Sequence, residues 1–167
     1  MKRILIFFES RYPRPIGGPI SALPIVQISC NMLHNTAADI EGHVWTWGWG
    51  GRGRLGHGND LSLHIPTVVD ALNHASVTQD LQTQNKQNND EEDTITEMED
   101  LRLNKMLRMS IVVQIACGAE HTLMLTRGGI VYGCGENSNG QLGIGTSNDC
   151  RTPTKIDGSL KIQKIEI

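Results

Sequence analysis

Two Cys-x-x-x-His pairs have the residue types and spacing to bind a metal ion. Cys30 and His34 form the first pair, and Cys117 and His121 form the second. Together they contain the two thiolates and two imidazoles of a tetrahedral zinc site. Each pair, however, begins in a short apolar segment and ends beyond a turn, at the same place in its own half of the chain. We therefore interpret each pair as a small buried thiol and a histidine with backbone hydrogen bonds, and we expect neither metal nor cofactor.

The stretch GHVWTWGWGGRGRLGHG, residues 42–58, contains all three tryptophans of the chain. Trp45, Trp47 and Trp49 recur at period two, so on a strand they would share one face and could stack sugars or bases. Alternatively, the first two lie in a core strand, where tryptophan is favoured. Glycines in this stretch also spell G-x-G-x-x-G, but a phosphate-binding loop of that kind needs a helix after it, and no helical apolar period follows.

The other titratable residues form no catalytic constellation in the sequence. Arg52 and Arg54 are the only basic pair beside aromatic residues, which is a weak indication of nucleic-acid binding. The net charge is −3, and no apolar run reaches the roughly 18 residues of a membrane span. We expect an intracellular protein, cytoplasmic or nuclear. Six acidic residues lie at expected hairpin or loop positions and are not paired in sequence: Asp39, Glu41, Asp60, Glu120, Glu136 and Asp149.

The chain repeats itself with a shift of 87 residues. Residues 26–67 align with residues 113–154 without a gap, and 14 of these 42 positions are identical. The second copy has Tyr132, Cys134 and Glu136 in place of the three tryptophans, so the repeat requires neither a tryptophan platform nor a phosphate loop. The repeat positions that we expect to be structural are Cys30, His34, Gly42, Trp47, Gly48, Gly53, Leu55, Gly56, Gly58, Cys117, His121, Gly129, Gly135, Gly140, Leu142, Gly143 and Gly145.

Each copy predicts four short strands. PIVQISC is apolar and β-branched, the next segment alternates, and DIEGHV and TRGGIV are typical of tight hairpins with glycine at positive φ. HVWTWG and IVYGCG follow as third strands, and a glycine-rich loop leads to a fourth extended segment after Pro66 or Pro153. Four strands with glycine turns are typical of one β-propeller blade. We therefore expect an all-β fold of about two four-stranded antiparallel blades of an incomplete propeller, separated by a polar, partly helical or disordered insertion.

These residues resemble the repeat of the regulator of chromosome condensation family. Its motif runs as hydrophobic-x-I-x-C-G, two residues, H-T, a hairpin, V-Y-x-W-G, a loop and G-Q-L-G-x-G. The second copy matches at Cys117, at His121 and in the run from Gly140, but has Cys134 where the family has tryptophan. The first copy has that tryptophan as Trp47 and lacks the C-G and H-T. The resemblance implies a seven-bladed propeller in full-length relatives.

The alignment divides the chain into five parts. We expect residues 1–24 to be the tail of a preceding repeat or a non-native N-terminus, and residues 25–73 to be the first repeat. An insertion at 74–110 precedes the second repeat at 111–158, and residues 159–167 begin a third, truncated repeat. Because propellers need about four to eight blades, we expect this chain to be a fragment whose remaining blades are missing.

The insertion at 74–110 is acidic and polar. Residues 79–93 almost lack apolar side chains, and we expect them to be disordered. The sequence from Thr94 fits a helix capping box, and Met98 and Leu101 follow at helical spacing, which predicts a helix in the second half. The segment is interpreted either as a solvated loop with a nascent helix or as an amphipathic partner-binding element.

The sequence favours a non-enzymatic module that mediates protein–protein interaction. The resemblance implies relatives that exchange nucleotide on the Ran GTPase, and propellers joined to ubiquitin-ligase or kinase domains. A guanine-nucleotide exchange factor for a Ran-like small GTPase and part of a ubiquitin-ligase-associated propeller stay open as alternatives, as does binding of carbohydrate, nucleic acid or chromatin. We expect no membrane partner. The candidate partner-binding residues are Trp49, Arg52, Arg54, Met98 and Leu101.

Overall fold

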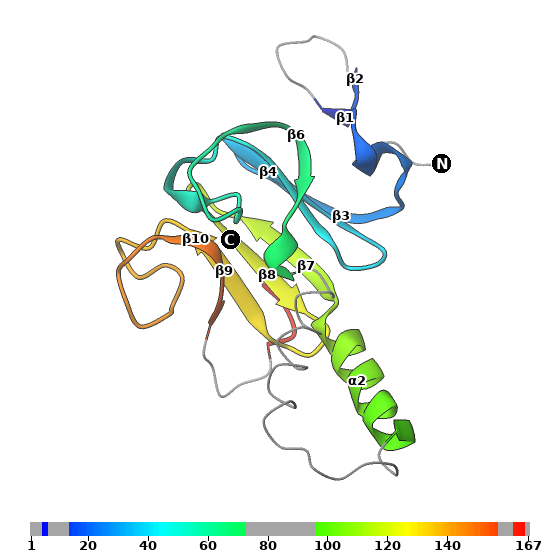
Figure 1. Ribbon diagram of the computed structural model, residues 1–167. Coiled ribbons are helices and arrows are strands. Elements are labelled where there is room, and N and C mark those ends of the chain that lie inside the picture. The colour runs from blue at the N-terminus through cyan, green and yellow to red at the C-terminus, as the bar shows by residue number, and fades with distance from the viewer. Residues whose placement is uncertain (1–4, 7–13, 73–95, 157–161, 166–167) are drawn as a thin grey trace.

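A computed structural model describes the chain except for residues 1–4, 7–13, 73–95, 157–161 and 166–167 (Figure 1). Its strands are β1 (Leu5–Ile6), β2 (Arg14–Pro15), β3 (Ile25–Cys30), β4 (His34–Asp39), β5 (Val44–Gly48), β6 (Leu63–Val68), β7 (Val112–Cys117), β8 (His121–Thr126), β9 (Val131–Gly135) and β10 (Cys150–Ile156). Its helices are the 3-10 turns η1 (Pro19–Ala22), η2 (Gly51–Gly53) and η3 (Asp70–Leu72), and the α-helix α2 (Thr96–Ser110).

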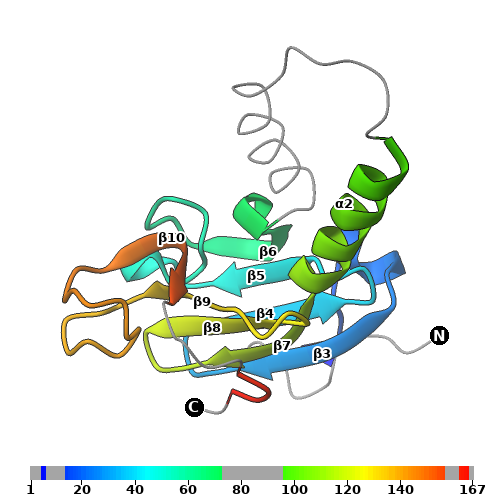
Figure 2. The ribbon, with the colours of Figure 1, turned by 90° about the horizontal axis from the view of Figure 1, so that it is seen from below.

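The strands form two four-stranded antiparallel sheets of the same topology. Blade 1 has the strand order β3-β4-β5-β6, and blade 2 has the order β7-β8-β9-β10. The blades lie against each other, with β3 and β7 along one side of the molecule and β6 and β10 along the other (Figure 2). This arrangement confirms the expected all-β fold with partial propeller blades.

Glycine closes the hairpin between the second and third strands of each blade. Gly42 has a φ of 88° and Gly129 a φ of 80°, in the left-handed region that side chains with a Cβ rarely adopt. Asp39 secures the first hairpin, because its buried carboxylate accepts hydrogen bonds from the backbone N–H of Glu41 and of His43, each at 3.0 Å. The positive φ predicted from the sequence at both glycines is therefore confirmed.

The fourth strand of each blade begins earlier than the sequence predicted. β6 starts three residues before Pro66, and β10 starts three residues before Pro153. In both blades the pairing with the third strand shifts register at the proline of the fourth strand. The shift falls between residues 63 and 67 of β6 and between residues 150 and 154 of β10. Proline lacks an N–H donor and is tolerated at such an irregularity, so it does not mark the start of the strand.

Three apolar clusters hold these layers together. The first lies between the blades, the second joins blade 1 to the segment before it, and the third joins blade 2 to Ile165. The clusters comprise Ala38, Val44, Val69, Val112, Ile115, Met124 and Cys134; Ile16, Ile20, Ala37, Trp45 and Trp47; and Ala116, Leu125, Val131 and Ile165. Each blade thus makes apolar contacts on both faces, as expected for a unit that stacks in series.

The insertion contains the predicted helix. α2 runs from Thr96 to Ser110 and leads into β7 (Figure 1). The segment 79–93 and the side chain of Met98 lie outside the described residues, so the predicted disorder stays a prediction. Leu101 is 71% exposed on α2.

Among the described residues no helix is both long and apolar enough to cross a bilayer.

We predict that Gly129→Val destabilises the fold by about 2 kcal/mol, because a β-branched residue is strained at this positive φ. Chemical denaturation followed by circular dichroism measures the change. Gly17→Val is the control, since Gly17 is exposed and a Cβ placed there would meet nothing within 4 Å. Equal stability of the two variants would contradict the role of the hairpin glycine.

Candidate functional site

Of the two Cys-x-x-x-His pairs, His34 and Cys117 each contact the other blade. No group of three metal-ligating side chains occurs within the described part of the chain. Cys117 is buried with its Sγ 3.3 Å from Thr36 Oγ1, but Cys30 is exposed. The expectation of a buried thiol in each pair is therefore wrong for Cys30, because the face of β3 on which it lies has no neighbouring blade.

His34 connects the blades through a side chain and not through backbone, contrary to the expectation. Its Nε2 lies 2.8 Å from Thr122 Oγ1, and that hydroxyl donates to the carbonyl of Arg54 at 2.9 Å. Because the hydroxyl proton is used, Nε2 must be the donor, and Nδ1 is a bare acceptor. Nδ1 is buried and has no hydrogen-bond partner among the described residues. Burial, then the charge of Arg54 and of His121, lowers the pKa of His34 to about 4.

The three tryptophans do not form one platform. Trp45 and Trp47 are buried in the cluster on the outer face of blade 1, 8% and 5% exposed, as the core alternative predicted. The Nε1–H of Trp45 donates to Asp39 Oδ2 at 3.0 Å. Trp49 lies beyond the end of β5 and is 46% exposed. Only this third tryptophan is available to a partner.

Arg54 packs against the ring of Trp49. Its guanidinium lies 4.2 Å from the centroid of the Trp49 ring, a cation–π contact. Its Nε donates to the carbonyl of Gly51 at 2.9 Å, and its Nη1 donates to the carbonyl of Ala119 in blade 2 at 2.8 Å. The Arg54 side chain is fully buried. Proposed from the sequence as a partner-binding residue, it instead contacts this chain, because the two loops close over it.

Arg52 brings together three acidic residues of blade 2 that lie far from it in sequence. Its Nε lies 3.1 Å from Glu120 Oε2, and its Nη1 lies 3.4 Å from Glu136 Oε1 and 3.3 Å from Asp149 Oδ2. Arg52 is 47% exposed and has a φ of 61°, the one positive φ among the described non-glycine residues. Backbone strain of this kind persists only where the surrounding contacts enforce it.

An apolar surface lies beside this ionic cluster at the same end of blade 1. Met32 is 94% exposed, Leu33 42% and Leu61 68%, and together with Trp49 we call these side chains the rim patch. The N–H of Trp49 donates to the carbonyl of Leu33 at 2.8 Å, so the strand turn and the loop that supply the patch are in contact. The aligned residues of the second copy are Ala119, Glu120, Glu136 and Asn148. The rim patch is thus a property of blade 1 alone.

Among the repeat positions expected to be structural, the leucines are buried and the glycines have positive φ. Leu55 and Leu142 are each 1% exposed. Positive φ occurs at all ten repeat glycines: Gly42, Gly48, Gly53, Gly56, Gly58, Gly129, Gly135, Gly140, Gly143 and Gly145. Sequence reasoning missed the acidic partners of Arg52, since nothing in the spacing of Glu120, Glu136 and Asp149 points to a common site.

Comparison with known proteins identifies one repeat family. The sequence profile described as "Regulator of chromosome condensation (RCC1) repeat" matches residues 41–79 and 128–167, and a second profile of the same description matches 112–141. The chain is 33% identical over 141 residues to human E3 ubiquitin-protein ligase HERC2, covering 84% of this chain and 2% of that protein. It is 32% identical over 147 residues to the Arabidopsis thaliana ultraviolet-B receptor UVR8, covering 86% and 26%. The chain therefore spans about a quarter or less of these relatives.

Solved structures show the same fold. Human WBSCR16 superposes with a TM-score of 0.60 at 24% identity, over 89% of this chain and 30% of that one. Prp20p from Saccharomyces cerevisiae superposes with a TM-score of 0.57 at 16% identity, over 88% and 28%.

We predict that acid destabilises the contact at His34. The unfolded histidine binds a proton near pH 6.5, whereas the folded one does so only near pH 4. Stability is therefore complete above pH 6.5 and falls by about 3 kcal/mol as the pH drops through this window. Urea denaturation at several pH values measures the loss. His34→Gln should flatten this pH dependence and His64→Gln, at an exposed position, should not. An unchanged slope in His34→Gln would contradict the assignment.

We predict that the two arginines differ sharply in their contribution to stability. Arg54→Met leaves the Gly51 and Ala119 carbonyls without their donor and should cost about 3 kcal/mol. Arg52→Met removes half-exposed ion pairs and should cost under about 1 kcal/mol. Thermal unfolding in low and high salt compares the variants, and only the Arg52 contribution should shrink with salt. Equal losses would show that Arg54 is not the buried link.

Proposed function

This chain belongs to the regulator of chromosome condensation (RCC1) repeat family, and we propose that it is a non-enzymatic pair of propeller blades that binds a protein partner through the rim patch. A single observation carries this proposal. The rim patch places four exposed apolar side chains at one end of blade 1, at positions where the second copy of the same unit has alanine, asparagine or glutamate.

Support for a binding role comes from how Trp49 is held. A rigid, half-exposed aromatic ring over a buried arginine loses little conformational freedom on binding, and tryptophan and arginine are enriched at the energetic centres of protein interfaces. The ionic cluster around Arg52 borders the patch and supplies polar groups for its edge. An apolar centre with a polar border is the usual composition of a protein–protein interface.

The identity of the partner is a further part of the proposal. Prp20p, which shares this fold, has binding properties to Gsp1p and histones. Because the chain covers 28% of Prp20p, we propose binding of one of these partners without nucleotide exchange. An interface confined to one end of two blades is small, and small interfaces are weak or transient.

We predict that the chain binds Gsp1p or core histones with micromolar affinity and that Trp49→Glu weakens this binding at least tenfold. The substitution introduces the residue that the second copy has at the aligned position, so the loop tolerates it. Leu101→Glu on α2 is the matched control, also at an exposed apolar position, and should bind like the unaltered chain. Biolayer interferometry measures both variants.

The outcomes separate the candidate functions. Loss of binding in Leu101→Glu and not in Trp49→Glu would move the interface to α2. Binding to neither partner, or binding that ignores both substitutions, would contradict the proposal. Release of a fluorescent guanine nucleotide from loaded Gsp1p well above its intrinsic rate would instead support an exchange factor.

A further inference from the structure

A glutamine of blade 1 holds the main chain of blade 2. The Nε2 of Gln27 donates to the carbonyl of Ile115 at 3.1 Å, and the N–H of Ile115 donates to Gln27 Oε1 at 2.9 Å. One carboxamide thus makes both hydrogen bonds that a neighbouring strand would make at this residue. We call this arrangement the glutamine clamp.

The clamp occurs a second time, at the aligned residue of blade 2. The Nε2 of Gln114 donates to the carbonyl of Ile165 at 2.7 Å, and the N–H of Ile165 donates to Gln114 Oε1 at 2.9 Å. Both clamped isoleucines are buried, 2% exposed at Ile115 and 8% at Ile165. The clamp is therefore a repeated contact, made by the first strand of one blade to the segment that follows on its downstream side.

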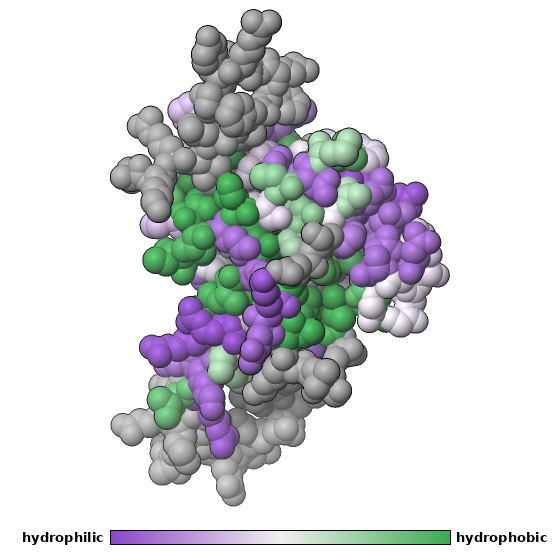
Figure 3. Space-filling model, turned by 180° about the vertical axis from the view of Figure 1, so that it is seen from behind, coloured by the Kyte–Doolittle hydropathy of each residue, from purple (hydrophilic) through white to green (hydrophobic). Residues whose placement is uncertain are grey.

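Ile28 is the aligned residue of blade 1, and within the described residues no glutamine clamps it. Ile28 pairs with Ala37 in the register in which Ile115 pairs with Met124, so its N–H and C=O point away from β4 as those of Ile115 point away from β8. Its side chain is 53% exposed. Hydrophobic side chains gather across the middle of the side of the molecule that Figure 3 shows.

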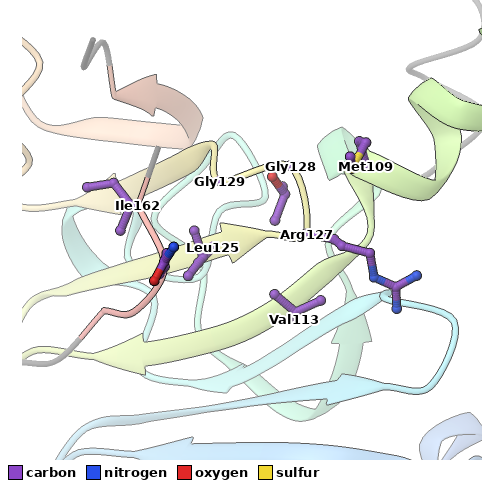
Figure 4. Close-up of a pocket in the computed structure, with 9 residues that line it drawn as sticks. Met109, Val113, Leu125, Arg127, Gly128, Gly129 and Ile162 are labelled. Atoms are coloured by element: carbon purple, nitrogen blue, oxygen red, sulfur yellow. The ribbon is translucent and has the colours of Figure 1, made fainter. Parts of the chain in front are cut away.

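The opposite end of the molecule carries the complementary half of the contact. Beside Gln114, the face of blade 2 has a pocket of about 350 Å³ lined by Val113, Leu125, Gly129 and Ile162 (Figure 4). Val113 is 40% exposed and Ile162 41%. The segment that holds this place is thus clamped at Ile165 but packs incompletely near its start.

We propose that a second copy of this chain docks head to tail on β3, with Gln114 of one copy clamping Ile28 of the next. The contact between the blades is heterologous: the downstream face of one blade meets the upstream face of the other. Such a contact repeats whenever both faces are presented. In this chain β3 is open at Ile28, whereas Ile16 and Ile20 cover the part of the same blade around Trp45 and Trp47.

Docking exchanges one segment for another. The incoming β3 takes the place of residues 162–165 of the accepting copy, and the clamp changes its partner from Ile165 to Ile28 without losing a hydrogen bond. The incoming strand also buries Ile28, which is half exposed in the single copy. Exchange of equivalent elements between copies is a low-cost route to association. Because propellers close at about four to eight blades, rings of two to four two-blade copies are expected.

The test is the mass of the full chain in solution, measured by size-exclusion chromatography with light scattering at several concentrations. The unaltered chain of 18.4 kDa should associate to two to four copies as its concentration rises. Ile28→Lys removes the acceptor face and Gln114→Ala removes the clamp, so each variant alone should be monomeric. Ile65→Lys, at another exposed isoleucine on β6, should associate like the unaltered chain.

A mixture of the two monomeric variants, measured in the same way, tests the proposed contact most directly. The Ile28→Lys copy still has Gln114, and the Gln114→Ala copy still has Ile28, so one intact contact forms and assembly should stop at a heterodimer. Circular dichroism confirms that both variants are folded. A chain that stays monomeric at about 100 μM, variants that associate like the unaltered chain, or a mixture that stays monomeric would each overturn the proposal.

Discussion

The contact between the blades depends on one constraint. The first strand of each blade lies at an edge of its sheet, and the main-chain N–H and C=O groups along that edge pair with no other described strand. Blades that stack face to face cannot join their inner strands into one ladder, yet buried N–H and C=O groups must be satisfied. Alternate side chains of β3 meet this need. Gln27 clamps Ile115, Ser29 Oγ accepts from the N–H of Cys117 at 3.0 Å, and Asn31 Nδ2 donates to the carbonyl of Cys117 at 3.4 Å. These side chains fix the register of the two blades.

The same constraint explains why the two repeats hold their neighbours unequally. At the positions aligned with Ser29 and Asn31, the second repeat has Ala116 and Gly118, which offer no side-chain hydrogen bond. Only the glutamine is retained, so the side chains of β7 hold the segment after blade 2 at Ile165 alone. A repeat can therefore keep the blade fold and still lose hydrogen bonds to the segment that follows it. The side chains that make these hydrogen bonds are different from the residues that form the turns and the core.

Periodicity and glycine positions were sufficient to predict the first three strands of each blade, the hairpins and the blade topology, because these depend on residues close in sequence. They were insufficient at the loops. The three tryptophans at period two predicted a common face, but Gly48, with a φ of 111°, ends β5 and turns Trp49 out of the alternation. The sequence alone does not show that Arg54 is buried, because its Nη1 donates to the carbonyl of Ala119, which belongs to the other blade.

Binding function is most readily changed at positions that the fold leaves free. The glycines and leucines of the β5–β6 loop set its path in both repeats, whereas the residues between them can vary without breaking a turn. At Trp49 and Arg52 the first repeat has a tryptophan and an arginine where the second has Glu136 and Asn139. Across the blade boundary these varied positions also contact each other, as Arg52 does with Glu136. The loop is consequently rigid enough to present Trp49 and variable enough for each blade to present a different surface, which is why we propose the rim of the blades, and not their strands, as the partner-binding surface.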